Sequence, residues 1–191
     1  MAIAGLYPFT SRWHAQGTLW IYSDPHFGDE ELAQGVPGRP TAEEQVKMIN
    51  SKVGKKDTII ILGDIGDIEY AKQIRGYKIL VAGNHDIGLT NYMEVFDEVY
   101  GGPLMISEKL ILSHEPLAMI PWAFNIHGHV HDKKAKTGPR HLNVCSDVIG
   151  YTPVNMNQFM KSGALSKIQT IHRETIDKAT EKSKKRKGKK R

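Results

Sequence analysis

The sequence predicts one α/β domain whose strands deliver polar side chains to a common edge. Short runs of β-branched and apolar residues recur along the chain, and each is followed at once by Asp, Asn or His. Such continuous apolar runs are typical of strands buried on both faces of a parallel sheet. Open α/β sheets bind ligands beyond the carboxyl ends of their strands, so we expect these polar residues to converge there.

The length and cysteine content of the chain indicate its domain size and its cellular environment. At 191 residues the chain is long enough to bury a sizeable core in one domain. Its single cysteine, Cys145, excludes an intrachain disulfide, which indicates a reducing, intracellular environment. Cys145 has no basic sequence neighbour, so we do not expect it to be a nucleophile. The N-terminus lacks a signal-peptide pattern and no apolar run is long enough to span a membrane, so we expect a cytoplasmic protein without a membrane partner.

The net charge of +5 belongs to the C-terminus. Residues 178–191 contain nine Lys or Arg and one acid, a charge of +8, and subtracting this from +5 leaves −3 for residues 1–177. A disordered tail that aids solubility and an electrostatic arm for nucleic acid explain this segment equally well. It has no aromatic residue to stack on bases, so such binding would be non-specific. We expect a domain over residues 1–165 and a disordered Lys-rich tail over residues 166–191.

The first predicted strand covers Thr18–Ser23, which is rich in β-forming residues. It ends in Asp24-Pro25-His26, and side chains two residues apart on an extended segment point the same way. Asp24 and His26 can therefore grip one ion, although an ordinary polar turn would give the same pattern. The residues before this strand are expected to be irregular, with three aromatic side chains packed on the core: Tyr7, Phe9 and Trp13.

A helix is predicted after the Gly- and Pro-rich loop 35–40. Thr41 is a candidate N-cap, and Glu44, three residues later, would complete a capping box. The helix should run to about Val53, with its apolar residues on one face.

The second buried strand is predicted at Asp57–Leu62, an apolar and β-branched run. It is followed by Asp64 and Asp67. We assign Asp64 to a metal, because it lies just beyond the strand end. Asp67 is expected to cap the next short helix, Ile68–Arg75, or to support the metal ligands from behind.

The third strand, Tyr77–Ala82, leads into a glycine turn that places three polar residues side by side. Asn84 offers a neutral oxygen to a metal. His85 can give or take a proton near neutral pH. Asp86 is expected to orient that histidine.

A short helix at Thr90–Phe96 and a hairpin of Val99–Ile106 with Lys109–Leu112 should follow. His114 comes directly after the hairpin, in the same position relative to its strand as the earlier polar residues. A lone histidine there is more often a structural, hydrogen-bonded residue. Glu115 is left out of the ligand set, because the other predicted ligands already supply enough carboxylates for a metal site.

Three alternating histidines lie further on: His127, His129 and His131. A chance run of surface histidines without a function is the alternative to a metal site, but the four earlier polar clusters argue against this alternative. A last strand is predicted at Arg140–Val144, and a final short helix at Met156–Met160.

Together the polar clusters resemble the motifs of the calcineurin-like metallophosphoesterase superfamily, in the family's order and over residues 18–131. The segment Asn143–Pro153 also looks like the closing stretch of small phage and bacterial members. The motifs are Asp24-x-His26, Gly63-Asp64-x-x-Asp67, Gly83-Asn84-His85-Asp86, His114 and Gly128-His129-x-His131.

The resemblance implies a two-sheet β-sandwich flanked by helices, in a four-layer αββα order, with a two-metal site. One metal would be held by Asp24, His26, Asp64 and His131. The other would be held by Asp64, Asn84, His114 and His129, with Asp64 bridging. His85 would be the proton donor or a phosphate contact, with Asp86 behind it. His127 lies outside this ligand pattern.

Oxygen and imidazole ligands without thiolate favour Mn²⁺ foremost, with Fe, Zn²⁺, Co²⁺ or Ni²⁺ as alternatives. The expected reaction is attack on phosphorus by a hydroxide that bridges the metals, with protonation of the leaving alkoxide by His85.

No large insertion follows the glycine turn to build a protein-docking surface. This favours a phosphodiesterase for small phosphoesters such as cyclic nucleotides or nucleic-acid ends. A phosphomonoesterase, including a protein Ser/Thr phosphatase, is the alternative, since the ligand set does not separate the two. A non-catalytic scaffold is less favoured, because the ligands and the acid are all present.

Overall fold

The structure, a computed structural model, describes residues 13, 17–118, 123–168, 176 and 178–181. The predictions for Tyr7, Phe9 and most of the Lys-rich tail therefore fall outside the described residues. Trp13 is buried in the core, as expected. No described helix is both long enough and apolar enough to cross a membrane.

The first sheet has five strands in the order β4-β3-β2-β1-β9. Its four neighbouring strands β1 to β4 are mutually parallel, and β9 runs antiparallel to β1. The three strands predicted as apolar runs are confirmed as β1, β2 and β3. The bounds are β1 Leu19–Tyr22, β2 Thr58–Ile61, β3 Tyr77–Val81, β4 Glu98–Tyr100 and β9 Val154–Asn155.

The second sheet has four strands in the order β5-β6-β7-β8. Strands β6, β7 and β8 are parallel, and the β5–β6 pair forms the predicted antiparallel hairpin. The bounds are β5 Leu104–Ser107, β6 Leu110–Leu112, β7 Phe124–His127 and β8 His141–Asn143.

The core lies in two layers, which follow from the alternation of side chains along a strand. Ile60 of β2 packs into the cluster that joins the two sheets, together with Leu112 and Ile126 of the second sheet. Its neighbours Ile59 and Ile61 point the other way, into the cluster under the helices.

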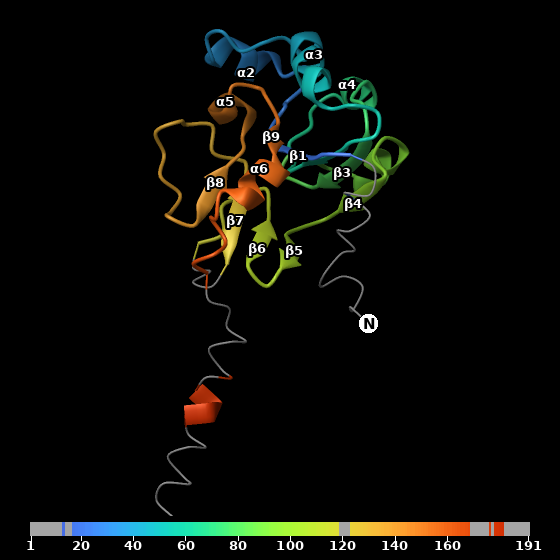
Figure 1. The fold of residues 1–191 in the computed structure, drawn as a ribbon. Coiled ribbons are helices and arrows are strands. Elements are labelled where there is room, and N and C mark those ends of the chain that lie inside the picture. The colour runs from blue at the N-terminus through green and yellow to red at the C-terminus, as the bar shows by residue number, and fades with distance from the viewer. Residues whose placement is uncertain (1–12, 14–16, 119–122, 169–175, 177, 182–191) are drawn as a thin grey trace, which may run out of the picture.

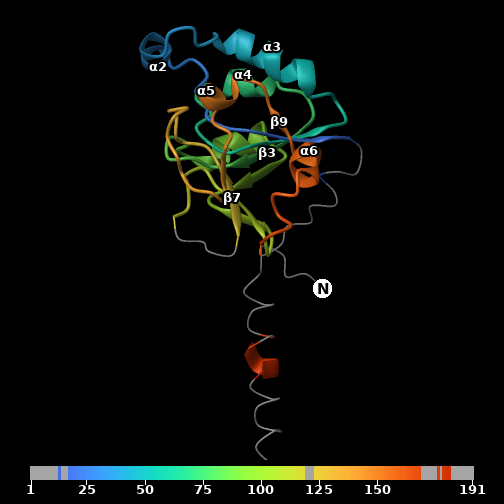
Figure 2. The same cartoon turned by 60° about the vertical axis from the view of Figure 1, so that its left-hand side comes forward.

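Helices cover the outer face of the five-stranded sheet (Figures 1 and 2). Helix α3 (Ala42–Lys52) packs on this face through buried residues such as Ile49, and α4 (Ile68–Lys72) lies beside it. The predicted capping box of Thr41 and Glu44 is confirmed at the start of α3. Asp67 caps α4, as predicted.

Some predicted elements differ from those observed. The run Val99–Ile106 is not one strand, because Gly101-Gly102-Pro103 breaks it and sends β4 and β5 to different sheets. The helix expected at Thr90–Phe96 is a 3₁₀ turn, η1 (Leu89–Glu94). Helix α6 is confirmed, whereas α2 and α5 were not predicted. These bounds are α2 Glu30–Gly35, α5 Ser146–Ile149 and α6 Met156–Lys161.

The carboxyl ends of the parallel strands of both sheets meet. Ser23, just after β1, forms a parallel β-bridge with Cys145, just after β8. The His114 ring, which follows β6, places Nδ1 2.7 Å from the carbonyl oxygen of Leu62, which follows β2. The loops that carry the polar clusters therefore share one edge.

Candidate metal centre

All seven predicted metal ligands lie in loops that follow parallel strands, and the structure brings them together in two groups. We call Asp24, His26 and His131 the first cluster, and Asp64, Asn84, His114 and His129 the second cluster.

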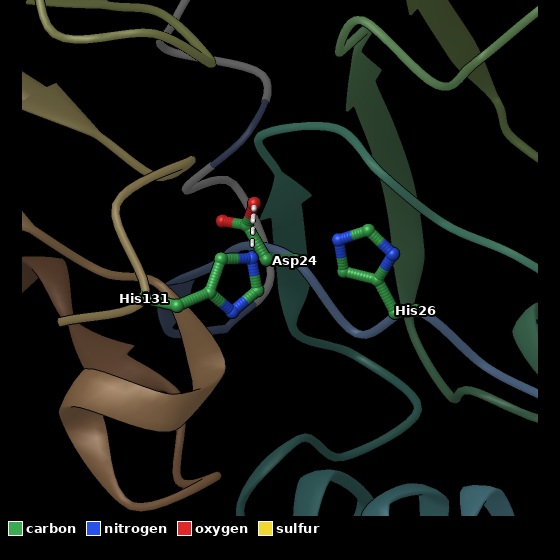
Figure 3. A group of neighbouring side chains, drawn as sticks. All are labelled: Asp24, His26 and His131. Atoms are coloured by element: carbon green, nitrogen blue, oxygen red, sulfur yellow. Dashed lines mark ion pairs between the residues drawn. The ribbon is translucent and has the colours of Figure 1, made fainter. Parts of the chain in front are cut away.

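The first cluster joins the loop after β1 to the loop after β7 (Figure 3). Donor atoms of Asp24, His26 and His131 lie within 4.8 Å of one another. His131 Nε2 is 3.8 Å from Asp24 Oδ1, and the rings of His26 and His131 have centroids 5.3 Å apart. The spacing leaves room for an ion between the three side chains.

The second cluster converges on one nitrogen. His114 Nε2 lies 2.7 Å from Asn84 Oδ1, 3.1 Å from His129 Nδ1 and 3.3 Å from Asp64 Oδ2. One imidazole N–H cannot serve three acceptors at once. Ligand atoms that each lie about 2.0–2.2 Å from one cation are separated from each other by distances similar to those measured here. The arrangement therefore has the donor set and the spacing of a cation site.

Asp64 stands between the clusters. Its Oδ2 is 3.3 Å from His114 Nε2 and 3.5 Å from His26 Nε2. Its Oδ1 accepts a hydrogen bond from the backbone N–H of His85 at 3.0 Å. A carboxylate that reaches both clusters through one oxygen is suited to bridge two cations.

The carboxylates of the centre sit in different electrostatic environments. Burial raises the pKa of Asp24, which is fully buried and accepts hydrogen bonds from the His129 backbone N–H. Burial also acts to raise the pKa of Asp64, but hydrogen bonds from His114 and the His85 amide outweigh it and lower the pKa. A cation beside Asp24 would offset the cost of burying its charge.

Burial and neighbouring charges also shift the pKa values of the histidines in the centre. Burial acts to lower the pKa of His114, but the hydrogen bond to Asp64 and the nearby Asp24 charge raise the pKa to about 9. Burial lowers the pKa of His26. The negative charges of Asp24 and Asp64 therefore favour a positive charge at His114, and they would favour a bound cation in the same way.

Four candidate ligands have a left-handed backbone conformation, which residues other than glycine rarely adopt. The φ angles are 56° at Asp24, 43° at His26, 54° at Asp64 and 64° at His129. Such conformations persist only where the surroundings fix them, and they cluster at functional sites. The loops are thus shaped around the side chains that they present.

Gly128 gives the His129 loop its close approach to Asp24. A Cβ at this position would overlap the side chains of Ser23 and Asp24. We expect Gly128→Ala to lower the free energy of unfolding by about 1–3 kcal/mol and to weaken metal binding. Chemical denaturation and metal titration would check both effects.

Gly35→Ala is the control for this substitution. Gly35 lies at the end of α2, and nothing is within 4 Å of its Cβ position. The control should leave stability unchanged or slightly raised. Equal stability of the Gly128 variant and wild type would refute the close approach.

The structure separates His85 from Asp86. His85 is exposed, and its ring lies 5.6 Å from that of His26. Asp86 is buried, and its carboxylate accepts hydrogen bonds from the backbone N–H groups of Asp64, Ile65 and Gly83. The prediction that Asp86 orients the His85 ring is therefore wrong: adjacent residues of this turn point in opposite directions, and Asp86 holds the loops together.

A cavity of about 530 Å³ opens beside the centre. It is lined on one side by metal-centre residues and His85, and on the other by α2 and its flanks, including Glu31, Leu32 and Val36. This wall was not predicted, because α2 is short and buries none of its residues.

His127 and Asp147 complete the surroundings. His127 is buried, and its ring nitrogens lie 2.8 Å from the carbonyl oxygen of Gly128 and 2.9 Å from Thr137 Oγ1, so it supports the loop. Asp147 was not predicted, yet its Oδ2 lies 2.6 Å from His131 Nδ1. Its one sequence signal is its position beyond the last predicted strand.

Comparison with known proteins gives a fold neighbour without a function. No protein-family model matches the sequence, and no curated protein matches it. A crystal structure of the protein of unknown function AQ665 from Aquifex aeolicus is similar, with a TM-score of 0.65 and 25% sequence identity. The similarity covers 75% of this chain and 98% of that protein. The mixed α/β architecture is thus shared with a solved structure.

Proposed function

We propose that this protein is a metal-dependent phosphodiesterase that hydrolyses small phosphodiesters. The observation that carries the proposal is the bridging position of Asp64 between two clusters of oxygen and imidazole donors, beside a cavity. Asp24, His26 and His131 would hold one divalent cation, and Asp64 would bind both. The second cation would be held by Asn84, His114 and His129.

The fold supports the same proposal. Two sheets packed through a common core, with helices outside one of them, agree with the sandwich of calcineurin-like metallophosphoesterases. The ligand loops follow the strands in the order that the family motifs require. We therefore place the chain with that superfamily as part of the proposal. Of the four layers of the expected αββα arrangement, the described residues form three: the helices α3 and α4, the five-stranded sheet, and the second sheet packed on its other face (Figure 1).

The donor set fits the metals expected for such a site. Carboxylate, amide and imidazole groups without thiolate suit Mn²⁺ first, and Fe, Zn²⁺, Co²⁺ or Ni²⁺ as well. Bound divalent cations supply Lewis acidity, which neutralises charge on phosphoryl oxygens and makes a hydroxide nucleophile available near neutral pH.

The chain's own residues do the remaining work. The His85 backbone N–H holds Asp64, so the same turn fixes the bridging carboxylate and presents the His85 ring at the cavity. A protonated His85 would donate its proton to the departing oxygen. The wall formed by α2 would contact the leaving group.

The charge of the cavity favours diesters over monoesters. None of the described residues that line it is lysine or arginine, whereas Asp29 and Glu31 belong to its wall. A phosphomonoester carries about two negative charges near pH 7. The two cations would attract either substrate, but the acidic wall would repel the dianion more strongly. A diester carries one charge, so this wall repels it less.

A first assay compares bis-p-nitrophenyl phosphate with p-nitrophenyl phosphate. We expect chelator-treated protein to be inactive, and added Mn²⁺ to restore hydrolysis with faster turnover of the diester. Faster monoester turnover would move the phosphatase alternative ahead. Inactivity on both substrates, with metal bound, would favour a non-catalytic scaffold.

A further inference from the structure

We infer that Asp147 is a positioning residue for the metal ligand His131, and that a buried Arg39 locks Asp147 in place. The inference rests on the proposed function, because it assigns a metal to the first cluster. It concerns a part of the chain, α5 and its flanks, that supplies none of the predicted ligands.

The two nitrogens of His131 face different partners. Nδ1 lies 2.6 Å from Asp147 Oδ2, and Nε2 points toward Asp24 in the first cluster. A proton held on Nδ1 by the carboxylate leaves the lone pair of Nε2 free for a metal. A carboxylate behind a metal-binding histidine also fixes the ring and raises its basicity.

Arg39 ties this carboxylate to the opposite half of the first cluster. Its side chain is only 1% exposed and forms an ion pair with Asp147. Its Nη2 donates hydrogen bonds to the carbonyl oxygens of Asp24, at 3.2 Å, and Pro25, at 2.7 Å. One guanidinium therefore holds the loop that carries Asp24 and His26 in register with the carboxylate that orients His131.

Tyr151 completes the set of partners. Its hydroxyl donates to Asp147 Oδ1, and the Arg39 guanidinium carbon lies 5.7 Å from the centre of its ring. Oδ1 of Asp147 thus accepts a hydrogen bond from Tyr151, and Oδ2 contacts both Arg39 and His131. A carboxylate held from three sides has little freedom to rotate away from the imidazole.

A third cation site at His131, Cys145 and Asp147 is the competing explanation, because donor atoms of these residues lie within 4.8 Å of one another. The charges argue against it. Asp147 Oδ2 already faces the guanidinium of Arg39, which would repel a cation.

The test is a calorimetric titration of metal-free protein with Mn²⁺, comparing wild type with Asp147→Asn. Wild type should bind two ions per chain. In the variant, one site should keep its affinity while the other weakens about 10- to 100-fold. Asp132→Asn is the matched control, since it makes the same change at an exposed residue next to His131 in sequence, whose carboxylate accepts a hydrogen bond from the Lys134 backbone N–H. It should retain both affinities.

The retained site reports that the variant is folded. If Asp147→Asn does not fold, because it leaves Arg39 buried without a countercharge, the double variant Arg39→Gln with Asp147→Asn removes both charges. The same loss at one site is expected for it. Unchanged binding at both sites, or equal weakening of both in folded protein, would overturn the inference.

Two further outcomes separate the inference from the proposed function. Wild type that binds no Mn²⁺ would refute the metal centre and the inference together. A thiolate-to-metal absorption band on loading wild type with Co²⁺ would place Cys145 among the ligands and overturn the role of Asp147 alone.

Discussion

Replacing Asp64 by asparagine is expected to lower kcat/KM for a phosphodiester by about 10³-fold or more. Asp64 is the side chain whose single oxygen lies near His26 of the first cluster and His114 of the second. The substitution removes the charge that would bridge two cations. Metal-ion catalysis is worth several kcal/mol, and about 1.4 kcal/mol corresponds to a tenfold change in rate.

The measurement is turnover of bis-p-nitrophenyl phosphate with Mn²⁺, together with the metal content of each protein. Asp67→Asn is the matched control, because Asp67 is an exposed N-cap three residues later and asparagine caps helices equally well. The control should keep wild-type activity and stability. Circular dichroism of both variants would show that the fold is intact.

An Asp64→Asn protein with more than about a tenth of wild-type activity would contradict a bridging role. Loss of activity with both metals retained would also be informative, since it would separate catalysis from metal binding. Equal losses in both variants would indicate damage to the loop after β2 rather than to the centre.

Local chemistry was sufficient to predict the elements that carry the site. The β-branched run of β2 is buried on both faces, as expected for the middle of a parallel sheet. The capping box of Thr41 and Glu44 marks the start of α3 in sequence and in structure. The polar residues after the strands could be grouped because parallel strands end at a common edge.

The two glycines before Pro103 are a turn signal that the prediction of one strand overlooked. Their effect is large, since β4 and β5 belong to different sheets. Asp86 shows a different limit. Its position next to His85 suggested a pair, but the turn points one side chain into the cavity and the other at three backbone amides.

Long-range contacts had no local signal. Arg39 lies in a Gly- and Pro-rich loop, and its partner Asp147 is 108 residues away. A buried ion pair of this kind needs both partners in place, because a lone buried charge is costly. Helix α2 was missed for a related reason: it buries no residue of its own and serves as a cavity wall.

His85→Ala is expected to slow hydrolysis of a diester with an alkoxide leaving group by about 10²- to 10⁴-fold, the usual contribution of general acid catalysis. The His85 ring lines the cavity, while its backbone N–H holds Asp64. An alanine keeps that backbone contact, so the metal centre should remain. The loss would therefore fall on the proton transfer.

The leaving group supplies the decisive comparison. Nitrophenolate is stable as an anion, so turnover of bis-p-nitrophenyl phosphate should fall by less than about tenfold, whereas a 2′,3′-cyclic nucleotide needs its ribose oxygen protonated. His85→Gln keeps a hydrogen-bond donor for a phosphoryl oxygen but cannot give up a proton. His141→Ala, at a half-buried histidine outside the lining of this cavity, is the control.

These variants distinguish the two roles of His85. If it is an acid, glutamine should be as poor as alanine on the cyclic nucleotide, and both should be nearly wild type on the nitrophenyl diester. If it only contacts phosphate, glutamine should restore activity on both substrates, and alanine should lose equally on both. Equal losses would remove the acid role and leave the leaving oxygen to be protonated by solvent.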